Sequence, residues 1–375
     1  IDRYHLEWSG EWICYDPELI EEYGDKARSL PPEYIFTDDK ILLQRTRRGL
    51  ARKLVATLDR EQYYNLNRVS NVVLNDEVDY DLGYILALLN SELLDSYFNW
   101  VFDEYEVKPS HLRKLPIKDL DVYSSKSDDY NTNSEYTEYI NSNTSLEQFV
   151  DHLHQQSDRT KHDVLSFLAQ SIESDYDSLR DLNLNLLDYL GNYTEGHTLP
   201  DIGLFQPTNS SILNATSEDY ENLRVGDVKT ERDGRRVTIY ATARYKPENE
   251  NEHDTDQWGY TETDYKEAFA LTDLSEEEAA LVGAFVPVAV EEADGFAGFR
   301  DNATKTNSLI DRLKVITLPD PDEVVDDLQR YIKTKERAEE LDEKIGKTDR
   351  LIDEIVYDLY GLTDEEIEVV ESEEG

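Results

Sequence analysis

The spacing of apolar residues changes near residue 80, and this change limits the possible folds more than any other feature of the sequence. Before it, short strand-like runs separated by turns predict a β-meander. These runs lie at 34–36, 41–44, 53–58 and 63–74. After it, apolar residues recur every three or four positions from Leu82 to Val101, which predicts an amphipathic helix. Strands followed by helices, without regular alternation between them, predict the α+β class.

The whole sequence is predicted to form four segments. They are a recognition domain at 1–118, an acidic linker at 119–145, a helical and mixed α/β region at 146–320 and a C-terminal helical segment at 321–375. Residues 1–16 predict a hairpin around Ser9–Gly10, and Asp233–Gly234 predicts a second hairpin between two strand-like runs. The last segment has an apolar seam of only about three heptads, which favours packing within the chain over a coiled coil between chains.

The stretch from Lys40 to Leu58 contains no Asp or Glu, although these two types supply 83 of the 375 residues. With a formal net charge of -45, most of the surface should repel a polyanion. A face that meets DNA must reverse that field locally, and Lys and Arg do so because their contacts with phosphates release counterions. The alternative is that these cations form ion pairs with carboxylates of the same chain. Composition alone does not decide between the two interpretations.

The composition also indicates the environment of the protein. An acid excess of this size, in a chain with 25 Tyr, 10 Phe and 4 Trp for its core, is typical of a surface adapted to high salt, so we expect a halophilic, archaeal source. The single Cys14 excludes an internal disulfide and fits a cytoplasmic protein, and no apolar run predicts a membrane span. Because the sequence begins at Ile1 and contains no Met, we expect a piece of a longer protein.

Three stretches, taken together, resemble one protein family. They are LLQRTRRGLARKLVATLD at 42–59, the helix LGYILALLNSELLDSYF at 82–98 with its Leu-Asn-Ser core at 89–91, and VKPSHLRKLPI at 107–117. With these stretches, residues 1–118 resemble the target-recognition domain of Taq-type adenine-N6 DNA methyltransferases, which include single-chain restriction-modification enzymes. The stretch LIDEIVYDLYGLTDEEIEVVE at 351–371 is similar to the C-terminal helix of many such enzymes.

The resemblance implies that this chain works with a preceding catalytic domain. In the family, that domain binds S-adenosylmethionine and carries an Asn-Pro-Pro-Tyr motif. Neither that motif nor a glycine-rich cofactor loop occurs in this sequence, so we expect no catalytic residue and no cofactor within the chain. The expected partners are double-stranded DNA and the chain's own N-terminal catalytic domain, with no membrane contact.

Ten cations of the first segment are predicted to contact DNA phosphates or guanine edges, because Arg and Lys match both. They are Lys40, Arg45, Arg47, Arg48, Arg52, Lys53, Arg68, Lys108, Arg113 and Lys114. A second acid-free stretch, GRRVTIYATARYKP at 234–247, predicts a secondary basic patch that consists of Arg235, Arg236, Arg244 and Lys246. The spacing of His152, His154 and His162 matches no zinc pattern, so no metal site is predicted.

The predicted function is sequence-specific recognition of double-stranded DNA. On this interpretation the chain is part of a site-specific adenine-N6 DNA methyltransferase of a restriction-modification or related phage-defence system. The alternative is a halophilic scaffold for protein–protein interaction that does not bind DNA, in which the basic stretch supplies internal ion pairs. A duplex-binding assay at high salt separates the two.

Overall fold

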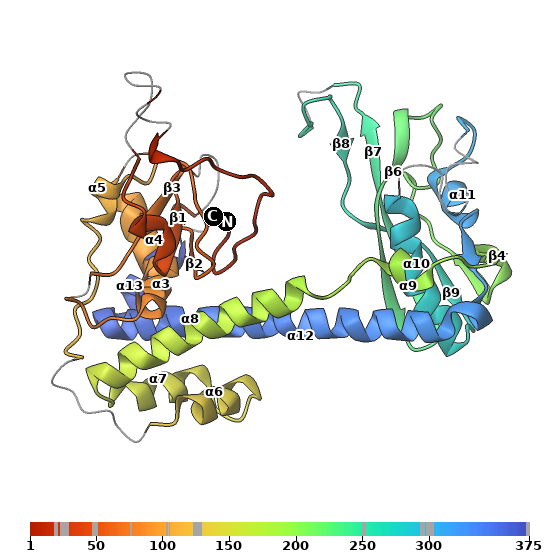
Figure 1. Cartoon of the computed structure of the whole chain (residues 1–375). Coiled ribbons are helices and arrows are strands. Elements are labelled where there is room, and N and C mark those ends of the chain that lie inside the picture. The colour runs from red at the N-terminus through yellow and green to blue at the C-terminus, as the bar shows by residue number, and fades with distance from the viewer. Residues whose placement is uncertain are drawn as a thin grey trace. The chain divides into compact units, whose positions relative to one another are not determined.

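The computed structural model describes residues 1–18, 22, 30–46, 52–75, 77–102, 104, 106–122, 130–249, 253–292, 297 and 304–372. The chain forms two compact units, unit 1 (Ile1–Leu182 with Ala338–Gly375) and unit 2 (Asn183–Arg337). Both contain helices and antiparallel strands, which confirms the α+β class (Figure 1). The unit boundaries differ from the four predicted segments, because parts of 119–182 and 338–372 contribute to the core of unit 1.

The sheet of unit 1 has three antiparallel strands with β1 in the centre. The strands are β1 (Lys40–Gln44), β2 (Ala56–Asp59) and β3 (Val69–Val72), in the order β2-β1-β3. They overlap three of the four predicted runs. The fourth run instead forms the short helix α2 (Tyr34–Thr37), in which Phe36 is buried and stacks on the ring of Tyr64 with 4.7 Å between the centroids. Three apolar residues were too short a run to distinguish a strand from a helical turn.

The hairpin predicted at 1–16 is not formed. Within these residues the structure has one isolated bridge, between Asp2 and His5. Long-range contacts hold the segment instead: the amide N of Tyr4 donates to the carbonyl of Ala56 at 2.9 Å, and Arg3 forms an ion pair with Asp349 at 2.5 Å. The sequence gives no local sign of these partners, which lie 52 and 346 positions away.

The predicted helix at 82–101 is divided by Ser91 into α3 (Leu82–Asn90) and α4 (Glu92–Val101). Several further helices complete unit 1. They are α5 (Pro109–Leu112), α6 (Thr132–Ile140), α7 (Leu146–His154), α8 (Asp158–Arg180), the last part of α12 (Pro321–Tyr360) and α13 (Asp364–Glu371). Helix α6 lies in the predicted linker and buries Tyr136 and Tyr139. The apolar seam of α12 packs into the core of unit 1, which confirms packing within the chain.

Unit 2 is built on an antiparallel sheet in the order β5-β9-β7-β6, with β8 paired to β7. Its strands are β4 (Glu195–Thr198), β5 (Leu204–Pro207), β6 (Glu221–Asp233), β7 (Arg236–Lys246), β8 (Thr261–Glu262), β9 (Lys266–Thr272) and β10 (Thr317–Pro319). Its helices are α9 (Leu186–Leu190), the 3-10 helix η2 (Leu199–Asp201), α10 (Glu276–Glu291), α11 (Leu309–Lys314) and the start of α12.

The hairpin predicted at Asp233–Gly234 is confirmed by the pairing of β6 with β7. Gly234 has φ 57°, a conformation in which glycine avoids the steric cost of a side chain. Helix α10 packs against both strands, and the odd-numbered residues of β7 from Val237 to Ala243 are buried. Among the described residues, no helix is both long and apolar enough to cross a membrane.

Candidate nucleic-acid interface

One end of the unit 1 sheet brings together predicted DNA-binding cations from three parts of the sequence. The amide N of Arg45, just after β1, donates to the carbonyl of Arg68 at 2.9 Å, and the amide N of Val107 donates to the carbonyl of Arg45 at 2.7 Å. Lys108 follows directly, and α5 then leads to Arg113. We call this the basic sheet end, defined by Arg45, Arg68, Lys108, Arg113 and Lys114.

The members of the basic sheet end differ in availability. Arg68, Arg113 and Lys114 are exposed, and neither Arg68 nor Arg113 forms an ion pair with any residue that the structure describes. The Nζ of Lys114 lies 5.9 Å from the ring centroid of Phe102. Arg45 is held by Glu106 at 2.5 Å and by the carbonyl of Asn67 at 2.8 Å, and Lys108 pairs with Glu104. Arg68, Arg113 and Lys114 are therefore the best-placed anion contacts.

Arg47 and Arg48, which the sequence also predicted as DNA contacts, lie outside the described residues.

Lys40 is not a DNA contact. It lies at the opposite end of β1 from Arg45, its side chain is fully buried, and it forms an ion pair with the equally buried Asp59. Its Nζ also donates to the carbonyl of Phe36 at 2.6 Å. Asp59 faces Lys40 across the β1–β2 pair, so the side chain that the sequence predicted to reach phosphate instead neutralises a carboxylate inside the protein.

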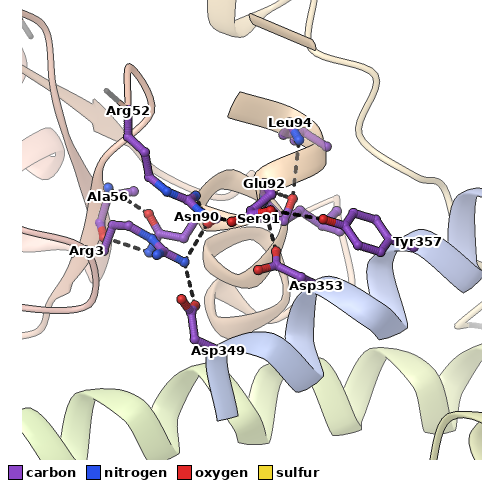
Figure 2. A network of polar contacts seen from close by, with 11 residues as sticks. Arg3, Arg52, Ala56, Asn90, Ser91, Glu92, Leu94, Asp349, Asp353 and Tyr357 are labelled. Atoms are coloured by element: carbon purple, nitrogen blue, oxygen red, sulfur yellow. Dashed lines mark hydrogen bonds and ion pairs between the residues drawn. The ribbon is translucent and has the colours of Figure 1, made fainter. Parts of the chain in front are cut away.

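The Leu-Asn-Ser core forms a corner between α3 and α4 that holds strand β2 (Figure 2). The buried amide of Asn90 forms two hydrogen bonds with the backbone of Ala56: its Oδ1 accepts from the N–H and its Nδ2 donates to the carbonyl, both at 2.9 Å. The Oγ of Ser91 accepts from the amide N of Leu94 at 3.4 Å and so caps α4. These two signature residues therefore have a structural role.

The same corner holds Arg52 and Lys53. Arg52 donates to the carbonyl of Asn90 and to Oε1 of Glu92, both at 3.0 Å, and its side chain is only 17% exposed. The amide N atoms of Lys53 and Leu54 donate to Oδ1 of Asp95 at 2.8 and 2.6 Å. Arg52 therefore has a structural role in this corner, and Lys53 is half-buried, so their predicted contacts with DNA stay a prediction.

Helix α12 completes this network from the far end of the sequence (Figure 2). The Oδ1 of Asp353 accepts from the amide N of Glu92 at 2.8 Å, and the hydroxyl of Tyr357 donates to Oε2 of Glu92 at 3.2 Å. Burial, together with the nearby charge of Asp349, raises the pKa of Asp353 to about 8. Sequence reasoning missed Asp349 and Asp353, because one carboxylate does not stand out among 83 acids.

The predicted secondary basic patch in unit 2 is not a single cluster. The Nε of Arg235 donates to the carbonyl of Leu274, and Arg236 lies 4.0 Å from Glu267. Arg244 and Lys246 instead lie near the ring of Tyr260, at the other end of β7. Arg235 and Arg236 therefore lie at one end of β7, and Arg244 and Lys246 lie at its other end.

The three histidines of the α7–α8 region contact different partners. The Nε2 of the buried His162 accepts from the amide N of Asp81 at 2.9 Å, His154 pairs with Asp358, and His152 pairs with Glu135. Over the part of the chain that the structure describes, no group of three or more His, Cys, Asp or Glu side chains is placed to hold a metal ion.

Residues 1–117 match the family model described as the TaqI-like C-terminal specificity domain. The matched region contains the three-stranded sheet, the α3–α4 corner and the basic sheet end. Searches of curated proteins and of solved structures found no match. The match supports a DNA-recognition role within a methyltransferase for this part of the chain.

Proposed function

We propose that this chain is the sequence-specific double-stranded DNA recognition region of a site-specific adenine-N6 DNA methyltransferase. The observation that carries the proposal is the family match over residues 1–117, because this region also contains the exposed cations of the basic sheet end. In a chain with a net charge of -45, such a cluster gives a local attraction for phosphate. We assign the enzyme to a restriction-modification or related phage-defence system in the cytoplasm of a halophile.

On this proposal the contacts with DNA come chiefly from Arg68, Arg113 and Lys114. Their charges would bind phosphates, and an Arg fork that enters the major groove would match O6 and N7 of a guanine. The target adenine must leave the base stack before its amino group can be methylated. The chain would therefore hold the duplex while a separate catalytic domain, which would bind S-adenosylmethionine, receives the base.

The test is selection from a random-sequence duplex pool, followed by affinity measurements on the enriched sequence across a salt series. The triple variant R68E/R113E/K114E should lose at least tenfold in affinity. The slope of log K against log salt should become shallower by about 2.7, because three phosphate contacts are removed. A triple variant with the same change in charge, K333E/K335E/R337E in α12, should retain both the affinity and the slope.

Two results would contradict the proposal. One is an equal loss of affinity in both triple variants, since this would mean that net charge and not the basic sheet end controls binding. The other is selection without any enriched sequence from protein that circular dichroism shows to be folded, since a recognition region must discriminate between sequences.

A further inference from the structure

Three cations of unit 2 converge on one tyrosine ring. Arg224 on β6 and Arg244 and Lys246 on β7 lie 4.5, 5.2 and 5.3 Å from the ring centroid of Tyr260. The strand register brings them together, because Arg224 and Arg244 are direct partners across the β6–β7 pair, and β8, which follows Tyr260, pairs with β7. The side chains of Arg244 and Lys246 lie on the face of β7 opposite the buried Ala243.

The carboxylates that the structure describes around this cluster leave two of its cations without an ion pair. Asp256 pairs with Arg244, and its Oδ1 accepts from the amide N atoms of Trp258 and Tyr260 at 2.8 and 3.0 Å. Glu262 faces Arg244 across the β7–β8 pair and accepts from the hydroxyl of Thr242.

Glu221 faces Lys246 in the strand register, yet neither Arg224 nor Lys246 forms an ion pair with any residue that the structure describes. Like charges held this close repel one another, so an anion bound between them would be stabilised. The cluster is therefore suited to bind an anion, because no described carboxylate forms an ion pair with Arg224 or Lys246.

A large aromatic side chain lies in the turn beside this anion site. Trp258 is 65% exposed, and its turn, from Asp256 to Tyr260, is fixed by the two hydrogen bonds to Asp256 and by the ion pair of Asp256 with Arg244. Cations that bind a phosphate backbone, next to aromatic rings on which bases stack, are the combination found in proteins that bind single-stranded nucleic acid. In a duplex the faces of the bases are covered by their neighbours, so an indole gains this contact only with an unpaired base.

We propose that unit 2 contains a binding site for single-stranded DNA. Arg224 and Lys246 bind its phosphates, Arg244 holds the turn through its ion pair with Asp256, and Trp258 stacks on an unpaired base. The site lies outside the residues 1–117 that match the specificity domain, and it is distinct from the duplex contacts proposed for unit 1. An acidic peptide would also match the cations, but it would leave the exposed indole without a function.

The test is fluorescence anisotropy of a labelled single-stranded deoxythymidine oligonucleotide with the full chain, measured across a salt series. The variant R224E/K246E should lose about tenfold or more in affinity, and its salt slope should become shallower by about 1.4, because two contacts with a single strand are lost. The control K333E/K335E, with the same charge change in the same unit, should keep the affinity and slope of the parent chain. Trp258→Ala should weaken binding of the oligonucleotide about tenfold while leaving binding of a duplex unchanged.

The outcomes distinguish a site for single-stranded DNA from non-specific charge attraction, from duplex binding and from binding of an acidic peptide. Binding of the oligonucleotide that R224E/K246E and K333E/K335E reduce equally would overturn the proposal. A loss of duplex binding that matches the loss of single-strand binding in Trp258→Ala would also overturn it, and so would displacement of the oligonucleotide by a polyglutamate peptide at equal charge concentration. The variant R68E/R113E/K114E should still bind the oligonucleotide, so failure of the unit 1 proposal would leave this one standing.

Discussion

Replacing Asn90 by Ala tests the α3–α4 corner most directly. The side chain of Asn90 is fully buried and accepts the hydrogen bond of the Ala56 N–H, whereas the Ala56 carbonyl keeps a second donor, the amide N of Tyr4. The substitution therefore leaves one buried donor unsatisfied, which costs about 1–3 kcal/mol, and removes buried atoms worth about 1 kcal/mol more. We expect the free energy of unfolding of unit 1 to fall by about 3 kcal/mol.

The assay is urea unfolding at high salt, followed by tryptophan fluorescence in a Trp258→Phe background. In that background the remaining tryptophans, Trp8, Trp12 and Trp100, all lie in unit 1, so the signal reports on this unit alone. With a urea dependence of about 2–3 kcal/mol per molar, the unfolding midpoint should fall by roughly 1 M. Asn133→Ala, at an exposed position of α6, is the matched control and should shift the midpoint little.

If Asn90→Ala and Asn133→Ala gave the same midpoint, the hydrogen bonds to Ala56 would contribute nothing net, and our account of the Leu-Asn-Ser core would be wrong. A normal midpoint with lost duplex binding would also contradict it, since that result would make Asn90 a DNA contact.

Two further predictions concern buried charges in unit 1. Lys40→Met should lower the free energy of unfolding by about 3–5 kcal/mol, because it leaves the buried Asp59 carboxylate without its cation, and the double variant K40M/D59N should recover part of the loss in the same urea assay; no recovery would refute the ion-pair account. The stability of unit 1 should fall as the pH rises from about 4 to about 8, because the folded state keeps a proton on Asp353 that the unfolded state releases at its ordinary pKa near 4. Asp353→Asn should make this decline of stability with pH shallower. Part of the decline should remain, because burial raises the pKa of Glu173 to about 7. An unchanged pH dependence in Asp353→Asn would contradict the role given to Asp353.

The elements that the sequence predicted correctly depend on local patterns. Three of the four strand runs, the helical character of 82–101 and the Asp233–Gly234 turn each follow from spacing or from turn chemistry within a few residues. The errors concern partners that lie far away in the sequence. Whether Lys40 or Arg52 reaches solvent depends on Asp59 and Glu92, which lie 19 and 40 positions further along the chain. In a chain with this many acids, the sequence offers no way to choose the carboxylate that captures a given arginine.

The candidate site, like the fold, was predictable only where its residues lie close together in the sequence. The acid-free stretch contains Arg45, one member of the basic sheet end, whereas the exposed members Arg68, Arg113 and Lys114 lie beyond that stretch. They reach the same sheet end because β3 and residues 106–107 pair beside β1, and strand pairing is decided by the tertiary fold. The cluster at Tyr260 was missed in part because Arg224 lies on a strand with many acids and becomes a neighbour of Arg244 only through the register.

The discontinuity of unit 1 has a consequence for synthesis on the ribosome. The core of unit 1 includes Ile345, Ile352 and Ile355, which are translated after all of unit 2. Domains generally fold as units in the order in which they emerge from the ribosome. The residues of unit 2 are contiguous, so unit 2 has its complete sequence while unit 1 still lacks residues 338–375. Until these residues emerge, the apolar core of unit 1 is incomplete. Because salts that are excluded from protein surfaces strengthen apolar association, the risk that this incomplete unit 1 aggregates should increase with salt concentration.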